Sequence, residues 1–133
     1  MPAASVVLIE DSVPYARLVE LILADAMPGG VEVRHHDTMR AARADLGERA
    51  ADCILLDFGL PDANGLEALA LALEVSGRAP VIVLSGHDDP ELATAAIRAG
   101  AQDYLVKGQE RPSAPFLQAI RSAIERGRRP SDS

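Results

Sequence analysis

Five polar residues of this sequence stand at the ends of short apolar runs, and their types could do chemistry together. They are Glu10, Asp11, Asp57, Ser85 and Lys107. If the runs are parallel strands, their ends meet at one edge of a sheet, and the polar groups would converge there. Three carboxylates held close resist joint ionisation unless a cation neutralises them. Because magnesium prefers one or two carboxylates with water and phosphate oxygens, the pattern predicts a magnesium site that handles phosphate.

Asp57 is the candidate nucleophile of this site. A carboxylate beside a divalent ion can take a phosphoryl group and become an acyl phosphate. Charge then develops on three oxygens, which the ion, the Lys107 ammonium and the Ser85 hydroxyl with nearby backbone N–H groups could each neutralise. Lys107 is the sole lysine beside twelve arginines. A compact ammonium suits this role differently from a planar guanidinium, which would explain the lysine.

Each of these residues also has a purely structural interpretation. Glu10 and Asp11 precede a predicted helix, where acidic groups favour the helix dipole and act as caps. Ser85 could be a plain turn residue, and Lys107 could extend its stem over the end of the sheet. Asp57 lies about seven residues before the next predicted helix, so capping does not account for it. The combination of all five favours function.

The apolar runs that must position these groups are short and rich in β-branched residues. Such runs predict parallel strands covered on both faces. One run alternates apolar and polar residues instead, as a half-exposed edge strand does. The alternating strand is expected at 31–34, and the others at 5–9, 53–56, 81–84 and 104–106.

Amphipathic patterns between the runs predict helices. Ser12 is expected to cap the first, Asp37 or Thr38 the second, and Gly100 to end the fourth. The helices are expected at 15–26, 38–46, 64–73, 90–99 and 114–126.

Strands alternating with helices predict a single doubly wound (βα)5 domain of the α/β class. Right-handed crossovers and the one amphipathic strand favour a parallel five-stranded sheet of flavodoxin-like order 2-1-3-4-5. The domain is expected to span residues 1–127, with 128–133 as a disordered tail or the start of a linker.

Composition narrows the class of function. The net charge of −7 argues against a nucleic-acid surface, which needs clustered cations. No apolar run approaches the roughly 18 residues of a membrane span, and the first residues lack the basic head of a signal peptide. We therefore expect a cytoplasmic protein without a membrane partner. The single cysteine, Cys53, lies in an apolar run and is expected to pack as a small hydrophobe.

Taken in order, the motifs resemble those of the response-regulator receiver domain of two-component signalling, the CheY-like family. The resemblance covers essentially the whole chain. Its residues are the pair Glu10-Asp11, the segment 57–65 with D-x-x-x-P-x-x-x-G spacing, Ser85-Gly86, and the segment 100–107.

This resemblance implies that Asp57 receives a phosphoryl group from the phosphohistidine of a histidine kinase or phosphotransfer protein. Asp11, Asp57 and the backbone carbonyl of Gly59 would bind Mg²⁺ directly, and Glu10 would act through water. Mn²⁺ could substitute for Mg²⁺. The domain would be a signalling phosphoacceptor, and it would assist only its own phosphoryl transfer and autodephosphorylation.

The resemblance also implies how phosphorylation is read out and ended. Ser85 and Lys107 would bind the phosphoryl oxygens. Tyr104 would turn inward as Ser85 is drawn toward the phosphate and so remodel the face of helix 4, strand 5 and helix 5, although a simple core role is its rival. His87 lies two residues after Ser85, and we predict that His87 and Gly59 tune dephosphorylation.

The sequence departs from the family after Lys107, where receivers usually carry a proline in a cis peptide bond. Gly108 stands there instead. A cis bond to glycine would cost several kcal/mol, so we expect a trans bond and a loop oriented by glycine's wide conformational range.

Other functions remain as alternatives. A pseudo-receiver would use the same fold as a protein-binding module without phosphorylation. A dehalogenase-type phosphatase would want a second acidic residue where Gly59 stands, and a flavin binder would suffer repulsion between the Glu10-Asp11 pair and the FMN phosphate. A transition-metal site at His35, His36 and Asp37 or His87 lacks ligand spacing.

The output of the domain lies outside these motifs. An effector domain or protein is an expected partner, and a homodimer through helix 4, strand 5 and helix 5 could form.

Overall fold

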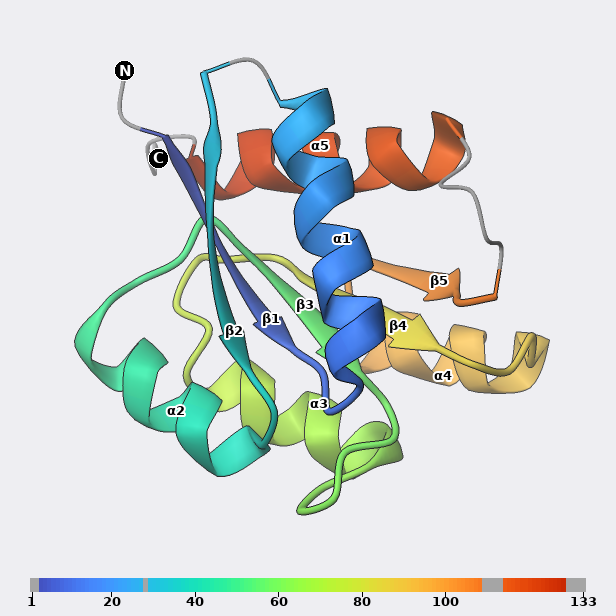
Figure 1. Ribbon diagram of the computed structural model, residues 1–133. Helices are drawn as coiled ribbons and strands as arrows, with labels where there is room; N and C mark the ends of the chain where they lie inside the picture. The colour runs from blue at the N-terminus through green and yellow to red at the C-terminus, as the bar shows by residue number, and fades with distance from the viewer. Residues whose placement is uncertain (1–2, 28, 109–113, 129–133) are drawn as a thin grey trace.

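Five strands alternate with five helices in the computed structural model, which describes residues 3–27, 29–108 and 114–128 (Figure 1). The elements are β1 Ala4–Ile9, α1 Val13–Ala26, β2 Val31–His36, α2 Met39–Glu48, β3 Cys53–Asp57, α3 Gly65–Glu74, β4 Val81–Ser85, α4 Pro90–Ala99, β5 Asp103–Val106 and α5 Ala114–Arg128.

All strand pairs are parallel, and the sheet has the order β2-β1-β3-β4-β5, which confirms the predicted topology. The three central strands are almost wholly buried, as their continuous apolar runs require. β2, at one edge, is only partly buried, in keeping with its alternating pattern. The register places Ile9 opposite Leu56 and Asp57 opposite Leu84, so the strand ends are level.

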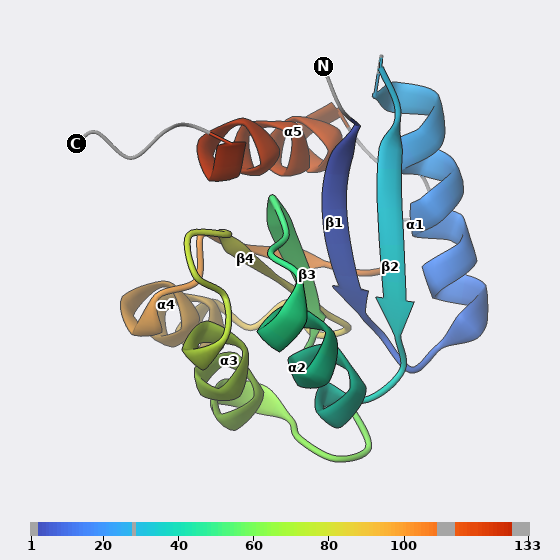
Figure 2. The same cartoon turned by 90° about the vertical axis from the view of Figure 1, so that its left-hand side faces the viewer.

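Helices cover both faces of the sheet (Figures 1 and 2). α1 and α5 pack on one face, and α2, α3 and α4 on the other. Successive strand side chains point to opposite faces, so each strand contributes to two separate apolar clusters. In β1, Val6 and Leu8 face α1 and α5, whereas Val7 and Ile9 face the other layer. Cys53 is fully buried, and burial raises the pKa of its thiol to about 12, which fits the predicted role of a small hydrophobe.

The helix ends follow the predicted capping. Ser12 Oγ accepts from the Tyr15 N–H at the start of α1, and of the two candidates for α2 it is Thr38 that caps, accepting from Ala41. Gly100 follows α4 with φ of 124°, a conformation that glycine adopts without strain.

Nearly every element differs from its predicted boundaries by one or two residues, and β2, β5 and α5 are examples. β2 continues to His36, because its ladder with β1 runs on to the Ile9–His36 pair. β5 begins one residue early, at Asp103, and α5 continues to Arg128 rather than ending at 126. The predicted tail otherwise lies outside the described residues. No helix in the described part of the chain is both long and apolar enough to span a membrane.

Candidate functional site

The carboxyl edge of the sheet brings the five polar residues of the sequence motifs together. Glu10 follows β1 directly, and Asp57 and Ser85 are the last residues of β3 and β4. Lys107 follows β5, where its backbone N–H donates to the Ser85 carbonyl at 2.7 Å. Parallel pairing with level strand ends is therefore what assembles the site.

An acid triad, defined as Glu10, Asp11 and Asp57, forms the floor of this site. Each offers a carboxylate oxygen within 4.8 Å of the other two. Glu10 is fully buried and Asp57 is 5% exposed, whereas Asp11 is open to solvent. Two buried carboxylates and one solvent-facing carboxylate suit a hard divalent ion that keeps several waters, so the donor set fits Mg²⁺.

Lys107 bridges the two buried acids. Its Nζ lies 2.6 Å from Glu10 Oε1 and 3.0 Å from Asp57 Oδ1. Among the described residues, Glu10 Oε1 is the buried side-chain oxygen that lacks a well-directed hydrogen bond. At such a distance opposite charges attract whatever the angle, so we treat the Lys107–Glu10 contact as an ion pair.

Charge in this site is unbalanced, with three carboxylates around one ammonium. Burial raises the pKa of Glu10 and the charge of Asp57 adds to this, against the lowering effect of Lys107 and of the Ser12 N–H, which donates to Oε2 at 3.0 Å. For Lys107, burial alone would lower the pKa, but the contacts with Glu10 and Asp57 outweigh it and raise the pKa. Lys107 therefore stays charged.

A pocket of about 330 Å³ opens beside Asp57, between the segments that follow β3 and β4. Asp57 Oδ1 accepts from the Gly59 N–H at 3.2 Å, so the backbone orients this carboxylate. Ser85 lies in the wall with its Oγ accepting from the His87 N–H at 3.1 Å. Because a hydroxyl also carries one donor hydrogen, Ser85 could donate to an oxygen in the pocket.

Tyr104 connects β5 to the segment after β4. Its hydroxyl donates to the His87 carbonyl at 2.9 Å, and its ring meets Phe58 edge-on, with centroids 6.2 Å apart. The residue is half-buried against the α3–α4 side of the core. Tyr104 thus has both a packing role and a direct link to the residue two places after Ser85.

The two histidines of β2 contact different partners. His35 Nε2 donates to the Glu10 carbonyl at 2.7 Å, and His36 Nε2 lies 2.7 Å from Asp45 Oδ2. Among the described residues, the acid triad is the group of three or more potential metal ligands that converges on one point. Within the described part of the chain, His35, His36 and Asp37 therefore do not converge into a transition-metal site.

Tyr15 was not among the predicted site residues, since the sequence placed it only at the start of the first predicted helix. Its ring centroid lies 4.7 Å from Lys107 Nζ. Tyr15 lies in the first turn of α1, directly after the Glu10-Asp11 pair and the Ser12 cap, and this position could have placed it near the site.

Asp62 was also missed, because its contact is with a distant segment. Its carboxylate accepts from the Met39 and Arg40 N–H groups at 2.9 Å and so fixes the start of α2 against the segment after β3. Burial alone would raise the pKa of Asp62, but these bonds outweigh it and lower the pKa below the ordinary 3.8.

The Lys107–Gly108 bond is trans, as expected, since the peptide bonds between described residues include none in the cis form. Gly108 has φ of 90°, so the chain leaves the site through a conformation that favours glycine. Residues 109–113 of this loop lie outside the described part.

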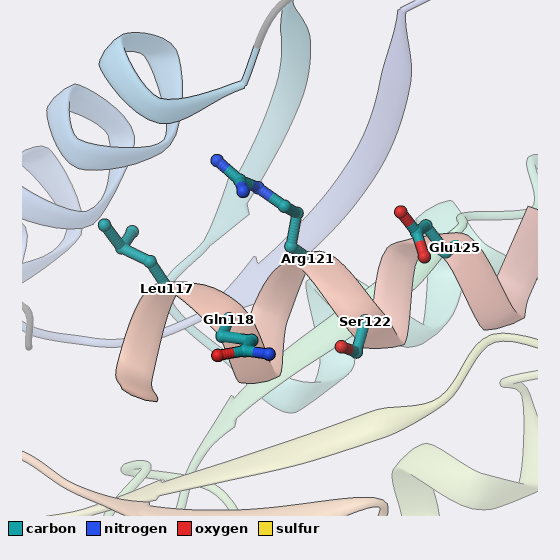
Figure 3. A pocket seen from close by; sticks show the side chains of 5 residues that line it. All are labelled: Leu117, Gln118, Arg121, Ser122 and Glu125. Atoms are coloured by element: carbon teal, nitrogen blue, oxygen red, sulfur yellow. The ribbon is translucent and has the colours of Figure 1, made fainter. Parts of the chain in front are cut away.

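A second, larger hollow of about 450 Å³ lies on α5 (Figure 3). It is lined by side chains of that one helix, among them Leu117, Arg121 and Glu125, and Arg121 donates to the Ala26 carbonyl at 2.9 Å. None of the five motif residues lines it. Although this hollow is larger than the pocket beside Asp57, it is therefore not the site where the five motif residues could act.

The level strand ends, the acid triad and the bridging lysine define a doubly wound domain of the CheY-like class. A family model described as the response regulator receiver domain matches residues 6–115, and the chain belongs to this family. Receiver domains of response regulators are signalling domains of two-component systems, as the resemblance implied.

Relatives of known name agree with this family. The response regulator protein TmoT of Ectopseudomonas mendocina is 33% identical over 96 residues, which cover 72% of this chain and 43% of TmoT. The luminescence regulatory protein LuxO of Vibrio campbellii is 33% identical over 120 residues, covering 89% of this chain and 26% of LuxO. The chain thus spans less than half the length of these relatives.

Solved structures show the same fold. The signal receiver domain of a putative Luxo repressor protein from Vibrio parahaemolyticus is 26% identical, with a TM-score of 0.81 and coverage of 94% of this chain and 92% of that one. NtrX from Brucella abortus is 30% identical, with a TM-score of 0.79, and the match covers 94% of this chain and 28% of the NtrX chain.

Proposed function

We propose that Asp57 accepts a phosphoryl group from the phosphohistidine of a histidine kinase or phosphotransfer protein. The observation that carries this proposal is the position of Lys107, which bridges Asp57 and Glu10 beside a pocket that also holds Ser85. An ammonium and a hydroxyl around one carboxylate are suited to neutralising a transferred phosphoryl group.

In the proposed reaction an oxygen of Asp57 attacks phosphorus and forms an acyl phosphate, while the phosphorus–nitrogen bond of the donor breaks. The released imidazole nitrogen keeps the bonding electrons and takes up a proton. Lys107 then exchanges its contact with the Asp57 carboxylate for a phosphoryl oxygen, and the Ser85 hydroxyl donates to another. Mg²⁺ bound by Asp11, Asp57 and the Gly59 carbonyl, with Glu10 acting through water, would neutralise phosphoryl charge.

The proposed switch starts at Ser85. When its hydroxyl turns to the phosphoryl group, the bond from the His87 N–H is disturbed, and His87 also holds the Tyr104 hydroxyl. Tyr104 would then turn inward and change the face formed by α4, β5 and α5. Through that face the domain would control an attached or separate effector, or form a homodimer.

Gly59 and His87 both line the pocket beside Asp57, and we assign them the tuning of dephosphorylation. The His87 side chain, and any side chain introduced at Gly59, would meet water that approaches the acyl phosphate. Comparing the phosphate lifetime of wild type with that of a variant substituted at both positions tests this role, and an unchanged lifetime contradicts it.

Mass spectrometry of the intact protein tests the central proposal. Incubated with Mg²⁺ and phosphoramidate, wild type should gain one phosphoryl group, which hydroxylamine removes because an acyl phosphate is reactive. Asp57→Ala should gain none, and Asp25→Ala, which removes an exposed acid of α1, should be labelled like wild type. Unlabelled wild type would favour a pseudo-receiver, and full labelling of Asp57→Ala would place the acceptor elsewhere.

A further inference from the structure

We infer that Tyr15 is a positioning residue for Lys107, which rests on the phosphoacceptor role proposed for the site. Lys107 Nζ lies between two carboxylates and one aromatic ring: Glu10 Oε1 at 2.6 Å, Asp57 Oδ1 at 3.0 Å and the Tyr15 centroid at 4.7 Å. An ammonium within about 6 Å of a ring centroid is attracted by the negative face of the ring.

The ring is held in place by the same turn that carries Asp11. Ser12 Oγ accepts from the Tyr15 N–H at 3.3 Å, and the Ser12 N–H donates to Glu10 Oε2 at 3.0 Å. Tyr15 is partly buried and packs against the α1–α5 side of the core. The backbone turn that positions Glu10 and Asp11 therefore also fixes the point from which the Tyr15 side chain extends.

Lys107 needs such support because the next residue, Gly108, does little to restrict the backbone. Gly108 follows with φ of 90°, and glycine has the widest conformational range of any residue. Contacts of the side chain itself must then define where the ammonium lies. The Lys107 side chain is only 18% exposed, consistent with neighbours on several sides.

A ring positions an ammonium without carrying a charge of its own. A further carboxylate would compete with the phosphoryl group for Lys107, whereas the tyrosine face adds attraction and leaves the full positive charge available. Tyr15 would thus hold Lys107 near Asp57 before transfer and leave it free to bind a phosphoryl oxygen afterwards. The phenol takes no part in the reaction itself, so Tyr15→Phe should retain this action.

The kinetic test compares rates of labelling by phosphoramidate with Mg²⁺. Tyr15→Leu should react about three- to tenfold more slowly than wild type, since a partly desolvated cation–π contact is of that strength. Tyr15→Phe should react within about twofold of wild type. Leu21→Ala, on the same helix at a side chain that is 70% exposed, is the matched control and should leave the rate unchanged.

A spectroscopic test follows Lys107 directly, because it is the only lysine of the chain. Protein made with lysine carrying ¹³C at the ε carbon shows one such signal, and the ring should shift its ε-proton resonance upfield in wild type and in Tyr15→Phe. In Tyr15→Leu the resonance should return toward the position of free lysine. Unfolding would abolish the upfield shift, so a retained shift in Tyr15→Phe shows an intact fold. If Tyr15→Leu does not fold, Tyr15→Met replaces it.

The two proposals fail in different ways. Labelled wild type with an equal rate for Tyr15→Leu overturns the inference about Tyr15 alone, as does an unshifted lysine resonance in wild type. Wild type that takes no phosphoryl group overturns the phosphoacceptor role, and the kinetic part of this inference falls with it.

Discussion

At the scale of a single residue, the buried carboxylate of Glu10 lowers the stability of the fold while it keeps a charge in the site. The side chain is fully buried, although it contacts Lys107 and the Ser12 N–H. Lys107 is shared with Asp57, so one ammonium cannot offset both buried acids. The net result is a pKa of Glu10 raised above the ordinary 4.5, chiefly by burial. The folded state consequently binds a proton at Glu10 more readily than the unfolded state does.

This direction predicts that Glu10→Gln is more stable than wild type at neutral pH. A raised pKa in the folded state means that the contribution of Glu10 to stability is fully present below pH 4.5 and is lost as pH rises through the folded-state pKa. A neutral isostere removes that loss, and we expect the free energy of unfolding at pH 7.5 to rise by more than the roughly 0.5 kcal/mol typical of a surface substitution. Urea denaturation at pH 7.5 and at pH 4 would measure it.

The advantage of Glu10→Gln should shrink at pH 4, where wild type carries a proton at this position. Glu125→Gln removes an exposed acid of α5 and should change stability by less than about 0.5 kcal/mol at both values. A Glu10→Gln variant that is less stable than wild type at pH 7.5 would mean that the ion pair with Lys107 outweighs the cost of burial.

At the scale of elements, the sequence predicted the features that depend on the local pattern of apolar and polar residues. Short runs that are apolar on both faces favour central parallel strands, and with right-handed crossovers this pattern predicted the order of the sheet and the meeting of the five motif residues. What pattern could not supply is contact between distant segments. The bonds of Asp62 to the start of α2 and the ring of Tyr15 over Lys107 depend on how helices sit on the sheet. The extension of β2 to His36 depends on its partner strand.

The end of α5 contains another contact of this kind. A Cβ added to Gly127 would overlap the carbonyl oxygen of Asp52, just before β3, and would lie 3.0 Å from Pro80 Cδ. The neighbouring atoms belong to backbone and a proline ring, which yield little. The helix can therefore approach the sheet this closely only with glycine at the position.

We expect Gly127→Ala to lower the free energy of unfolding by about 1–3 kcal/mol, because the end of α5 must move off the sheet. Gly47→Ala is the matched control, since a Cβ there meets nothing within 4 Å and the residue lies in α2. That substitution should raise stability by about 0.5–1 kcal/mol through helix propensity. Urea titration of both variants measures the contrast, and equal effects of the two would refute the close approach.

At the scale of the whole molecule, the fold stores negative charge at one edge of the sheet. The chain carries a net charge of −7, and three acids gather where β1 and β3 end. A divalent ion that binds the folded acid triad but not the unfolded chain must stabilise the fold by mass action. Because salt also screens the repulsion of a chain with this charge, the specific effect has to be separated from ionic strength.

We therefore expect Mg²⁺ to raise the melting temperature beyond the effect of NaCl at matched ionic strength. At a hundredfold excess over the dissociation constant the gain is about 2.7 kcal/mol, or roughly 10 °C for a domain of this size. Asp11→Asn removes the solvent-facing acid of the triad and should lose most of this gain, whereas Asp25→Asn, an exposed acid on α1, should keep it. Differential scanning calorimetry with Mg²⁺, and again after EDTA, measures both. An Asp11→Asn variant that gains as much as wild type would show that the ion binds elsewhere, and the fit of the acid triad to Mg²⁺ would be wrong.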